Sequence, residues 1–242
     1  MNDHELAAQA ATRAGELLLV VRDELAHAPV AQRKAAGDQR SHDFLIQILA
    51  QDRPHDAVLS EEGTDDLARL RSDRVWIVDP LDGTKEFAET GRQDWAVHVA
   101  LWQSGELVAG AVALPAQGIT LATPDIPVPP PYQGPPRIVV SRSRPPMVAL
   151  QVCERLSGQL VAMGSAGAKV AAVVQGLADI YVHAGGQYEW DSAAPVAVAR
   201  AAGLHTSRID GSALRYNRAD PFLPDLLVCR PEYADAVLRV TA

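Results

Sequence analysis

Seven prolines crowd residues 124–136, and this cluster limits the folds open to the chain more than any other feature. Proline fixes its own φ angle and has no backbone N–H group, so the segment can form neither a helix nor a central strand. We therefore interpret it as a surface loop or a crossing between two parts of the chain. The predicted parts are an N-terminal α+β half at residues 1–136 and a C-terminal α/β half at residues 137–242.

The first half is expected to combine two helices with short strands. Apolar residues recur on one face of residues 4–25 and predict a helix, and a second helix is expected from about residue 38 to residue 50. Residues 33–37 are interpreted as a short polar joint between them. Apolar runs of β-forming residues predict strands at 57–59 and 75–78, each ending in acidic residues. An antiparallel meander is expected over 95–102, 107–114 and 119–123.

The second half alternates between strand and helix patterns. Strands are expected at 138–140, 179–183 and 226–229, and helices at 147–156, 166–177 and 192–202. Alternation of this kind favours an α/β domain built of packed layers.

Composition narrows the function classes. The formal net charge of −8 argues against a general nucleic-acid surface, because such a surface needs excess Lys and Arg. Only two cysteines occur, Cys153 and Cys229, which favours buried free thiols in a reducing compartment over a disulfide scaffold or a zinc site. The acidic N-terminus is unlike a signal peptide, and no apolar run approaches the roughly 20 residues that span a bilayer. We expect a cytoplasmic protein that does not bind membranes.

The segment from Asp79 to Thr84, which reads Asp-Pro-Leu-Asp-Gly-Thr, is the strongest candidate for chemistry. Pro80 holds Asp79 in extended geometry, and Gly83 lets the backbone turn closely and expose amides to an oxyanion. Two carboxylates and the Leu81 carbonyl could then converge, and hard cations such as Mg²⁺ prefer oxygen ligands. An ordinary acidic turn is the alternative.

Further acids stand at the ends of predicted elements. Glu61 and Glu62 follow a strand, and only one of them is expected to join the acidic segment, because adjacent side chains on a strand point to opposite faces. Asp38 and Asp191 each stand at a predicted helix start, where a helix cap is the alternative. A metal site explains why an already anionic chain gathers these acids.

Residues 164–169, from Gly164 to Lys169, lie at a predicted strand-to-helix junction. Their glycine spacing is not that of a Walker A motif. Helix-start amides, the Ser165 hydroxyl and the Lys169 charge could still bind a phosphate or hydroxyl group. The alternative is an ordinary Gly/Ala helix packed closely on a sheet.

Three stretches together resemble the inositol monophosphatase superfamily, namely WIVDPLDGTKEF at 76–87, EWDSAAP at 189–195 and LSEE at 59–62. The resemblance covers nearly the whole chain. Within the superfamily, PLDGTKEF at 80–87, Ser141-Arg142-Ser143 and Gly164-Ser165 with Lys169 are most similar to bacterial 3′-phosphoadenosine-5′-phosphate phosphatases. The fold implied is a layered αβαβα sandwich, often dimeric.

The resemblance also implies roles for individual residues. The implied magnesium ligands are Glu61, Asp79, the Leu81 carbonyl, Asp82 and Asp191. The implied catalytic residues are Asp38, Thr84 and Glu61, of which Asp38 and Thr84 would orient and deprotonate the attacking water. The implied substrate-binding residues are Gly83, Thr84, Ser141, Arg142, Gly164, Ser165, Lys169 and Asp191. The family's longer loop before Asp38 is shortened here, which leaves Asp43 as a rival to Asp38 and leaves a third metal site open beside the expected two.

The expected activity is magnesium-dependent, lithium-sensitive hydrolysis of the 3′-phosphate of adenosine 3′,5′-bisphosphate or its sulfated form, as in sulfur assimilation. Direct phosphoryl transfer to water needs charge neutralisation and in-line positioning. Inositol monophosphatase and fructose-1,6-bisphosphatase activities are the enzymatic alternatives. The non-enzymatic alternative is a phosphate-ligand sensor. Loss of an acidic ligand would indicate such a sensor, but every expected acid is present.

Overall fold

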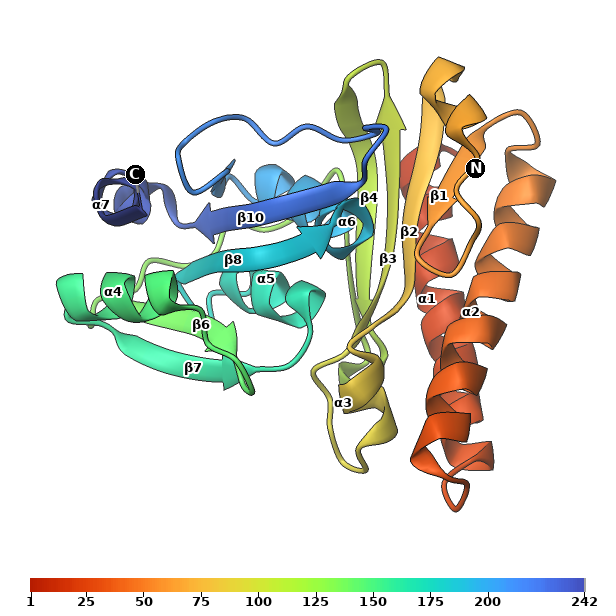
Figure 1. The fold of residues 1–242 in the computed structure, drawn as a ribbon, viewed down its shortest axis with the longest axis horizontal. Coiled ribbons are helices and arrows are strands. Elements are labelled where there is room, and N and C mark those ends of the chain that lie inside the picture. The colour runs from red at the N-terminus through yellow and green to blue at the C-terminus, as the bar shows by residue number, and fades with distance from the viewer. Residues whose placement is uncertain (242) are drawn as a thin grey trace.

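The chain forms five layers in the computed structural model, which describes residues 1–241 (Figure 1). Helices α1 (Asp3–Glu24) and α2 (Val30–Asp52) cover the outer face of the first sheet, and α5 (Ala166–Val174) and α6 (Glu189–Ala201) lie between the two sheets. Helices α4 (Met147–Arg155) and α7 (Pro231–Thr241) form the last layer. The predicted αβαβα sandwich is confirmed.

The first sheet is built before the proline-rich segment. Its strands pair in chain order, β1 and β2 in parallel and the rest antiparallel, so the predicted meander is confirmed. The strands are β1 (Ala57–Ser60), β2 (Arg74–Asp82), β3 (Ala96–Gln103), β4 (Glu106–Leu114) and β5 (Ile119–Ala122). Three short helical segments flank them: η1 (Leu67–Arg71), α3 (Thr84–Ala88) and η2 (Pro115–Gln117).

The second sheet follows the proline-rich segment, and its strand order is β7-β6-β8-β10-β9. The strands are β6 (Arg137–Ser141), β7 (Gln159–Met163), β8 (Ile180–Tyr188), β9 (His205–Ser207) and β10 (Phe222–Cys229). Three elements of this half were not predicted from the sequence. Strand β7 is an edge strand with mostly exposed residues and β9 has only three residues, all polar, so both carry a weak apolar pattern. Helix α7 is amphipathic and buries Ala234 and Val237, a pattern that the sequence interpretation overlooked.

The start of α2 corrects the predicted polar joint. The helix begins at Val30, directly after Pro29, and residues 33–37 are helical. Lys34, Ala35 and Ala36 favour helix, and the glycine that follows them is packed so tightly that a Cβ on Gly37 would lie 2.7 Å from the Phe87 ring. Asp38 is therefore inside the helix and is not its cap.

The layers pack closely where small residues meet. A Cβ on Gly110 of β4 would lie 2.6 Å from the Ala197 Cβ of α6, so this glycine lets the helix approach the sheet. Residues 124–136 contain no helix or strand and connect the two sheets, as predicted. Because α5 and α6 contact both sheets, the division of the chain into two halves at residue 136 stays a prediction. None of the helices in residues 1–241 is long and apolar enough to cross a membrane.

Candidate metal centre

A β-bulge at the end of β2 places two acids on one side of the first sheet. Asp79 pairs with His98 and Asp82 pairs with Ala96, so two residues on β2 stand opposite one on β3. In a regular strand, residues three apart face opposite sides of the sheet, and the extra residue brings Asp79 and Asp82 to the same side. Pro80 is tolerated because a residue in a bulge does not have to donate a backbone hydrogen bond to the neighbouring strand.

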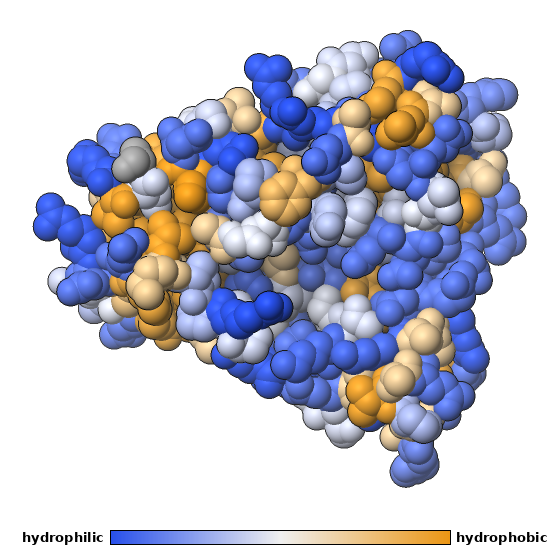
Figure 2. Space-filling model, in the orientation of Figure 1, coloured by the Kyte–Doolittle hydropathy of each residue, from blue (hydrophilic) through white to orange (hydrophobic). Residues whose placement is uncertain are grey.

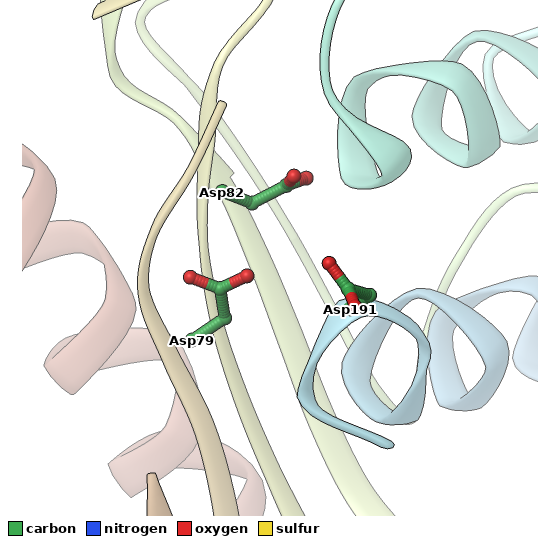
Figure 3. A group of neighbouring side chains, drawn as sticks. All are labelled: Asp79, Asp82 and Asp191. Atoms are coloured by element: carbon green, nitrogen blue, oxygen red, sulfur yellow. The ribbon is translucent and has the colours of Figure 1, made fainter. Parts of the chain in front are cut away.

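Asp191 approaches these acids from the other half of the chain. It is the third residue of α6, and its Oδ2 accepts a hydrogen bond of 2.6 Å from the Tyr188 backbone amide, so it also caps the helix. One carboxylate oxygen from each of Asp79, Asp82 and Asp191 lies within 4.8 Å of the others. Figure 3 shows the three carboxyl groups facing a common space between β2 and α6. We call these residues the aspartate triad.

Asp82 is held in place by the start of α5. Its Oδ1 accepts from the Ala166 amide at 3.2 Å and its Oδ2 from the Gly167 amide at 2.5 Å. A Cβ on Gly167 would lie 2.0 Å from the His98 Nε2, so only glycine fits there. The sequence suggested these helix-start amides for a phosphate, but Asp82 uses two of them.

Residues 164–169 are further tied to their own backbone. The Ser165 hydroxyl accepts from the Ala168 amide at 3.0 Å and so caps α5. The Lys169 ammonium donates to the carbonyls of Gly164 and Ser165, and burial lowers its pKa. These residues nevertheless line the pocket described below.

His98 is a member of the site that the sequence interpretation missed. It is fully buried on β3, its Nδ1 lies 3.0 Å from the Trp190 carbonyl oxygen, and its Nε2 lies 3.2 Å from Asp82 Oδ2. The imidazole therefore links the end of β2 to the start of α6, next to Asp191. The signal was a histidine in an otherwise apolar strand, whose partners depend on strand register.

The carboxyl groups of the site repel one another in the protein alone. Burial and the charge of Glu61 raise the pKa of Asp79 well above its usual value. Burial and repulsion by Asp82 raise the pKa of Asp191 to about 6. Burial would also raise the pKa of Asp82, but His98 and the Gly167 amide hold it below its usual value. Buried anions at this spacing fit a divalent cation bound by oxygen ligands.

Glu61 and Leu81 border the triad without belonging to it. Glu61 follows β1 and lines the pocket, and desolvation together with repulsion by Asp191 raises the pKa of its carboxyl group to about 7. The Leu81 carbonyl oxygen lies 3.2 Å from the Thr84 hydroxyl oxygen. Neighbouring Glu62 is exposed and lies close enough to Asp38 to raise the pKa of that carboxyl.

The structure brings Asp38, and not Asp43, to Thr84. The Thr84 hydroxyl donates to Asp38 Oδ1 at 3.2 Å. Burial and the Glu62 charge raise the pKa of Asp38 to about 6. Asp43 lies on the exposed side of α2 and accepts from Gln39 at 2.8 Å. Asp38 and Thr84 thus form a pair beside the acidic bulge.

The acids stand at one end of a pocket of about 410 Å³ between the two sheets. Figure 2 shows this face of the molecule hollowed between its two halves, with mostly hydrophilic residues around the hollow. Residues from both halves line it: Glu61, Asp82, Gly83, Glu86, Ser141, Gly164, Ser165, Ala166, Lys169, Tyr181, His183, Gly186, Gln187, Tyr188 and Asp191. Arg142 is not among them and instead donates to Glu86 and Glu89, both at 3.0 Å.

Comparison with known proteins decides the family. The sequence profile of the inositol monophosphatase family matches residues 3–125 and 138–239, and the break falls in the proline-rich segment. The chain belongs to the inositol monophosphatase family. Members of this family depend on metal ions, and the aspartate triad of this member could bind them.

Several relatives align with this chain over most of its length. The 3′-phosphoadenosine 5′-phosphate phosphatase of Mycobacterium bovis is 52% identical over 238 residues, which are 95% of this chain and 89% of the relative. The 3′(2′),5′-bisphosphate nucleotidase CysQ of Escherichia coli is 30% identical over 233 residues, 89% of this chain and 94% of the relative. The crystal structure of CysQ from Bacteroides thetaiotaomicron has a TM-score of 0.77 at 28% identity and covers 94% of this chain and 97% of that one.

Proposed function

We propose that this chain is a magnesium-dependent phosphatase that hydrolyses the 3′-phosphate of adenosine 3′,5′-bisphosphate and releases AMP and phosphate. The observation that carries the proposal is the aspartate triad, two of whose members, Asp82 and Asp191, line the pocket. The Asp38–Thr84 pair stands beside it, next to the acidic bulge. The names of the mycobacterial and enterobacterial relatives support this substrate. The sulfated nucleotide is a second candidate substrate of the same class.

Asp79, Asp82 and Asp191 are the proposed metal ligands, and Glu61 and the Leu81 carbonyl complete two sites. Their oxygen chemistry suits Mg²⁺. When bound, magnesium neutralises charge on the phosphate and lowers the pKa of a water molecule. The raised pKa values of Glu61 and Asp191 fit this role, because these carboxyl groups lose repulsion when a cation lies between them.

The chain's own groups position the nucleophile. Thr84 donates to one oxygen of Asp38, which leaves the other free to accept a proton from the attacking water. We propose that the amides of Gly83 and Thr84 hold the phosphate, because Gly83 lines the pocket and turns the chain in the left-handed conformation just before α3.

Substrate recognition is proposed for four residues of the second half that line the pocket, which are Ser141, Gly164, Ser165 and Lys169. Arg142 would act at the rim, because it is paired with Glu86 and Glu89. A homodimer and a cytoplasmic location stay predictions of the same proposal.

The test is phosphate release from three substrates side by side: adenosine 3′,5′-bisphosphate, inositol 1-phosphate and fructose 1,6-bisphosphate. Each is measured with Mg²⁺, with EDTA and with added Li⁺. We expect the bisphosphate nucleotide to have the highest kcat/KM, no release in EDTA and inhibition by Li⁺. Preference for either other substrate would overturn the substrate assignment, and full activity in EDTA would overturn the metal assignment.

A further inference from the structure

One wall of the pocket is shaped by a second β-bulge, in β8. Gln187 pairs with Leu223 and Ala184 pairs with Asp225, so two residues of β8 stand opposite one of β10. The two bulge residues of β8 are Gly185 and Gly186. Their φ angles are +121° and +86°, in a region that residues other than glycine rarely adopt. Bulges re-aim the side chains that follow them. Here those side chains are Gln187 and Tyr188, and both line the pocket.

Tyr188 presents an open aromatic surface at this wall. One side of its ring is stacked on Trp190, with centroids 4.8 Å apart and planes 12° from parallel. The ring of Phe222 meets it edge-on at 6.0 Å. Tyr188 nevertheless keeps 45% of its surface exposed and Phe222 keeps 47%. The open side of such a supported ring suits a flat heterocycle, since nucleobases stack on aromatic side chains.

The close contact of these rings depends on the bulge. A Cβ on Gly186 would lie 2.6 Å from the Phe222 ring, so the glycine makes room for Phe222 to stand beside Tyr188. The packing of Phe222 beside Tyr188 therefore depends on a glycine at this position of the bulge.

Gln187 supplies a polar group without a partner. The residue is only 8% exposed, and its Nε2 donates to no hydrogen-bond acceptor in residues 1–241. A buried donor without a partner costs free energy that a ligand acceptor can remove. The terminal torsion of glutamine is soft, so the amide can turn toward the pocket. A carboxamide offers one donor and one acceptor side by side, which matches the edge of adenine.

This wall differs chemically from the metal end of the pocket. Its lining residues on β8 are Tyr181, His183, Gly186, Gln187 and Tyr188, and none carries a carboxylate. A neutral, flat group is therefore favoured here, while the phosphate belongs at the aspartate triad.

We propose that Gln187 and Tyr188 form a base-recognition site that selects adenine, with Tyr188 stacking on the base and Gln187 pairing with its edge. The inference rests on the proposed function, because it assigns the binding site for the base of the proposed nucleotide substrate. The test distinguishes failure of the base site from failure of the proposed function by comparing a nucleotide with a phosphate ester that has no base.

The experiment measures kcat/KM for adenosine 3′,5′-bisphosphate, its uridine analogue and glycerol 2-phosphate with wild type, Gln187→Leu, Tyr188→Ala and Tyr188→Phe. Gln187→Leu is expected to lower kcat/KM for the adenosine substrate by about 10- to 100-fold and to reduce the preference for adenine over uracil. Tyr188→Ala is expected to lower it by at least about 10-fold for both nucleotides, whereas Tyr188→Phe keeps the ring and stays near wild type. Turnover of glycerol 2-phosphate should change less than about twofold in all variants.

Equal losses on the nucleotides and on glycerol 2-phosphate would overturn the base site, because they would show a general defect. Unchanged nucleotide turnover in both Gln187→Leu and Tyr188→Ala would overturn it as well. Tyr188 is half exposed, so its alanine variant is expected to fold even if the buried Gln187→Leu variant does not. Failure of the wild type to hydrolyse either nucleotide while it hydrolyses glycerol 2-phosphate would instead overturn the proposed substrate.

Discussion

Replacing Asp79 by asparagine should stabilise the metal-free protein and abolish its response to magnesium. Asp79 is 1% exposed, and its carboxylate lies within 4.8 Å of those of Asp82 and Asp191. Two unit charges at that distance repel by about 3.5 kcal/mol at an effective dielectric constant of 20. Asp79 escapes part of this repulsion by holding a proton, since its pKa is raised well above the usual value. The expected gain is therefore about 1–3 kcal/mol.

Asparagine fits the site without other losses. Its Oδ1 can still accept the 3.0 Å hydrogen bond from the Leu81 amide, and its Nδ2 can donate to a neighbouring carboxylate. For a chain of this size the gain corresponds to a rise in Tm of roughly 2–10 °C in EDTA. Wild type should gain about 2.7 kcal/mol when Mg²⁺ is at 100 times its Kd, and Asp79→Asn should gain almost nothing.

The assay is thermal unfolding of wild type, Asp79→Asn and Asp43→Asn, each in EDTA and in a Mg²⁺ titration. Asp43→Asn is the matched control, because it removes the same charge from an exposed position on α2. It should change stability by less than about 0.5 kcal/mol and keep the Mg²⁺ response. The reasoning is refuted if Asp79→Asn is less stable than wild type in EDTA, or if Mg²⁺ stabilises both equally.

Three further predictions concern catalysis, pH and packing. Asp38→Asn should lower kcat by about 100-fold or more, as expected for loss of a general base, while Asp43→Asn keeps wild-type turnover; similar kcat values for the two variants would contradict the assignment. In EDTA, the raised pKa values of about 7 for Glu61 and about 6 for Asp191 mean that the folded state holds these protons more tightly than the unfolded state. Their contribution to stability is full below pH about 4 and is lost as the pH rises through 6 and 7, so the stabilisation by Mg²⁺, measured from urea midpoints, should grow from pH 5 to pH 8; a constant difference would count against it. Gly167→Ala should lower the free energy of unfolding by about 2 kcal/mol or more, because its Cβ would lie 2.0 Å from a buried imidazole nitrogen. Wild-type stability and Mg²⁺ response in that variant would show that α5 does not hold the site as described.

Local sequence was enough to predict much of the candidate site. The acids of the segment from Asp79 to Asp82 stand a few residues apart, and a bulge is sufficient to bring them together. Asp191 was predicted through its resemblance to a family signature, and the structure places it beside them. The roles of these residues as metal ligands stay predictions.

Contacts between elements could not be predicted in the same way. His98 meets Asp82 because of the pairing between β2 and β3, and the α5 amides reach Asp82 because two layers pack together. Neither contact can be predicted from a local sequence pattern. The same holds for Gln187, whose place in the pocket depends on the pairing of β8 with β10.

Parts of the fold were predicted from the sequence, and one part was predicted wrongly. The meander was predicted because its apolar pattern is strong, whereas the five layers were implied by the resemblance to the family. The start of α2 was placed too late, because the polar stretch at residues 33–37 was interpreted as a joint although it contains the helix formers Lys34, Ala35 and Ala36.

The most direct test of the metal site is a crystal of this protein grown with Mn²⁺ in place of Mg²⁺ and measured at an anomalous wavelength. The account predicts an anomalous peak at about 2.0–2.3 Å from carboxylate oxygens of Asp79, Asp82 and Asp191, a second beside it at Glu61 and the Leu81 carbonyl, and no equal peak outside this site. Peaks bound only by residues outside this site, or clear density for the three aspartates with no metal between them at millimolar Mn²⁺, would contradict it.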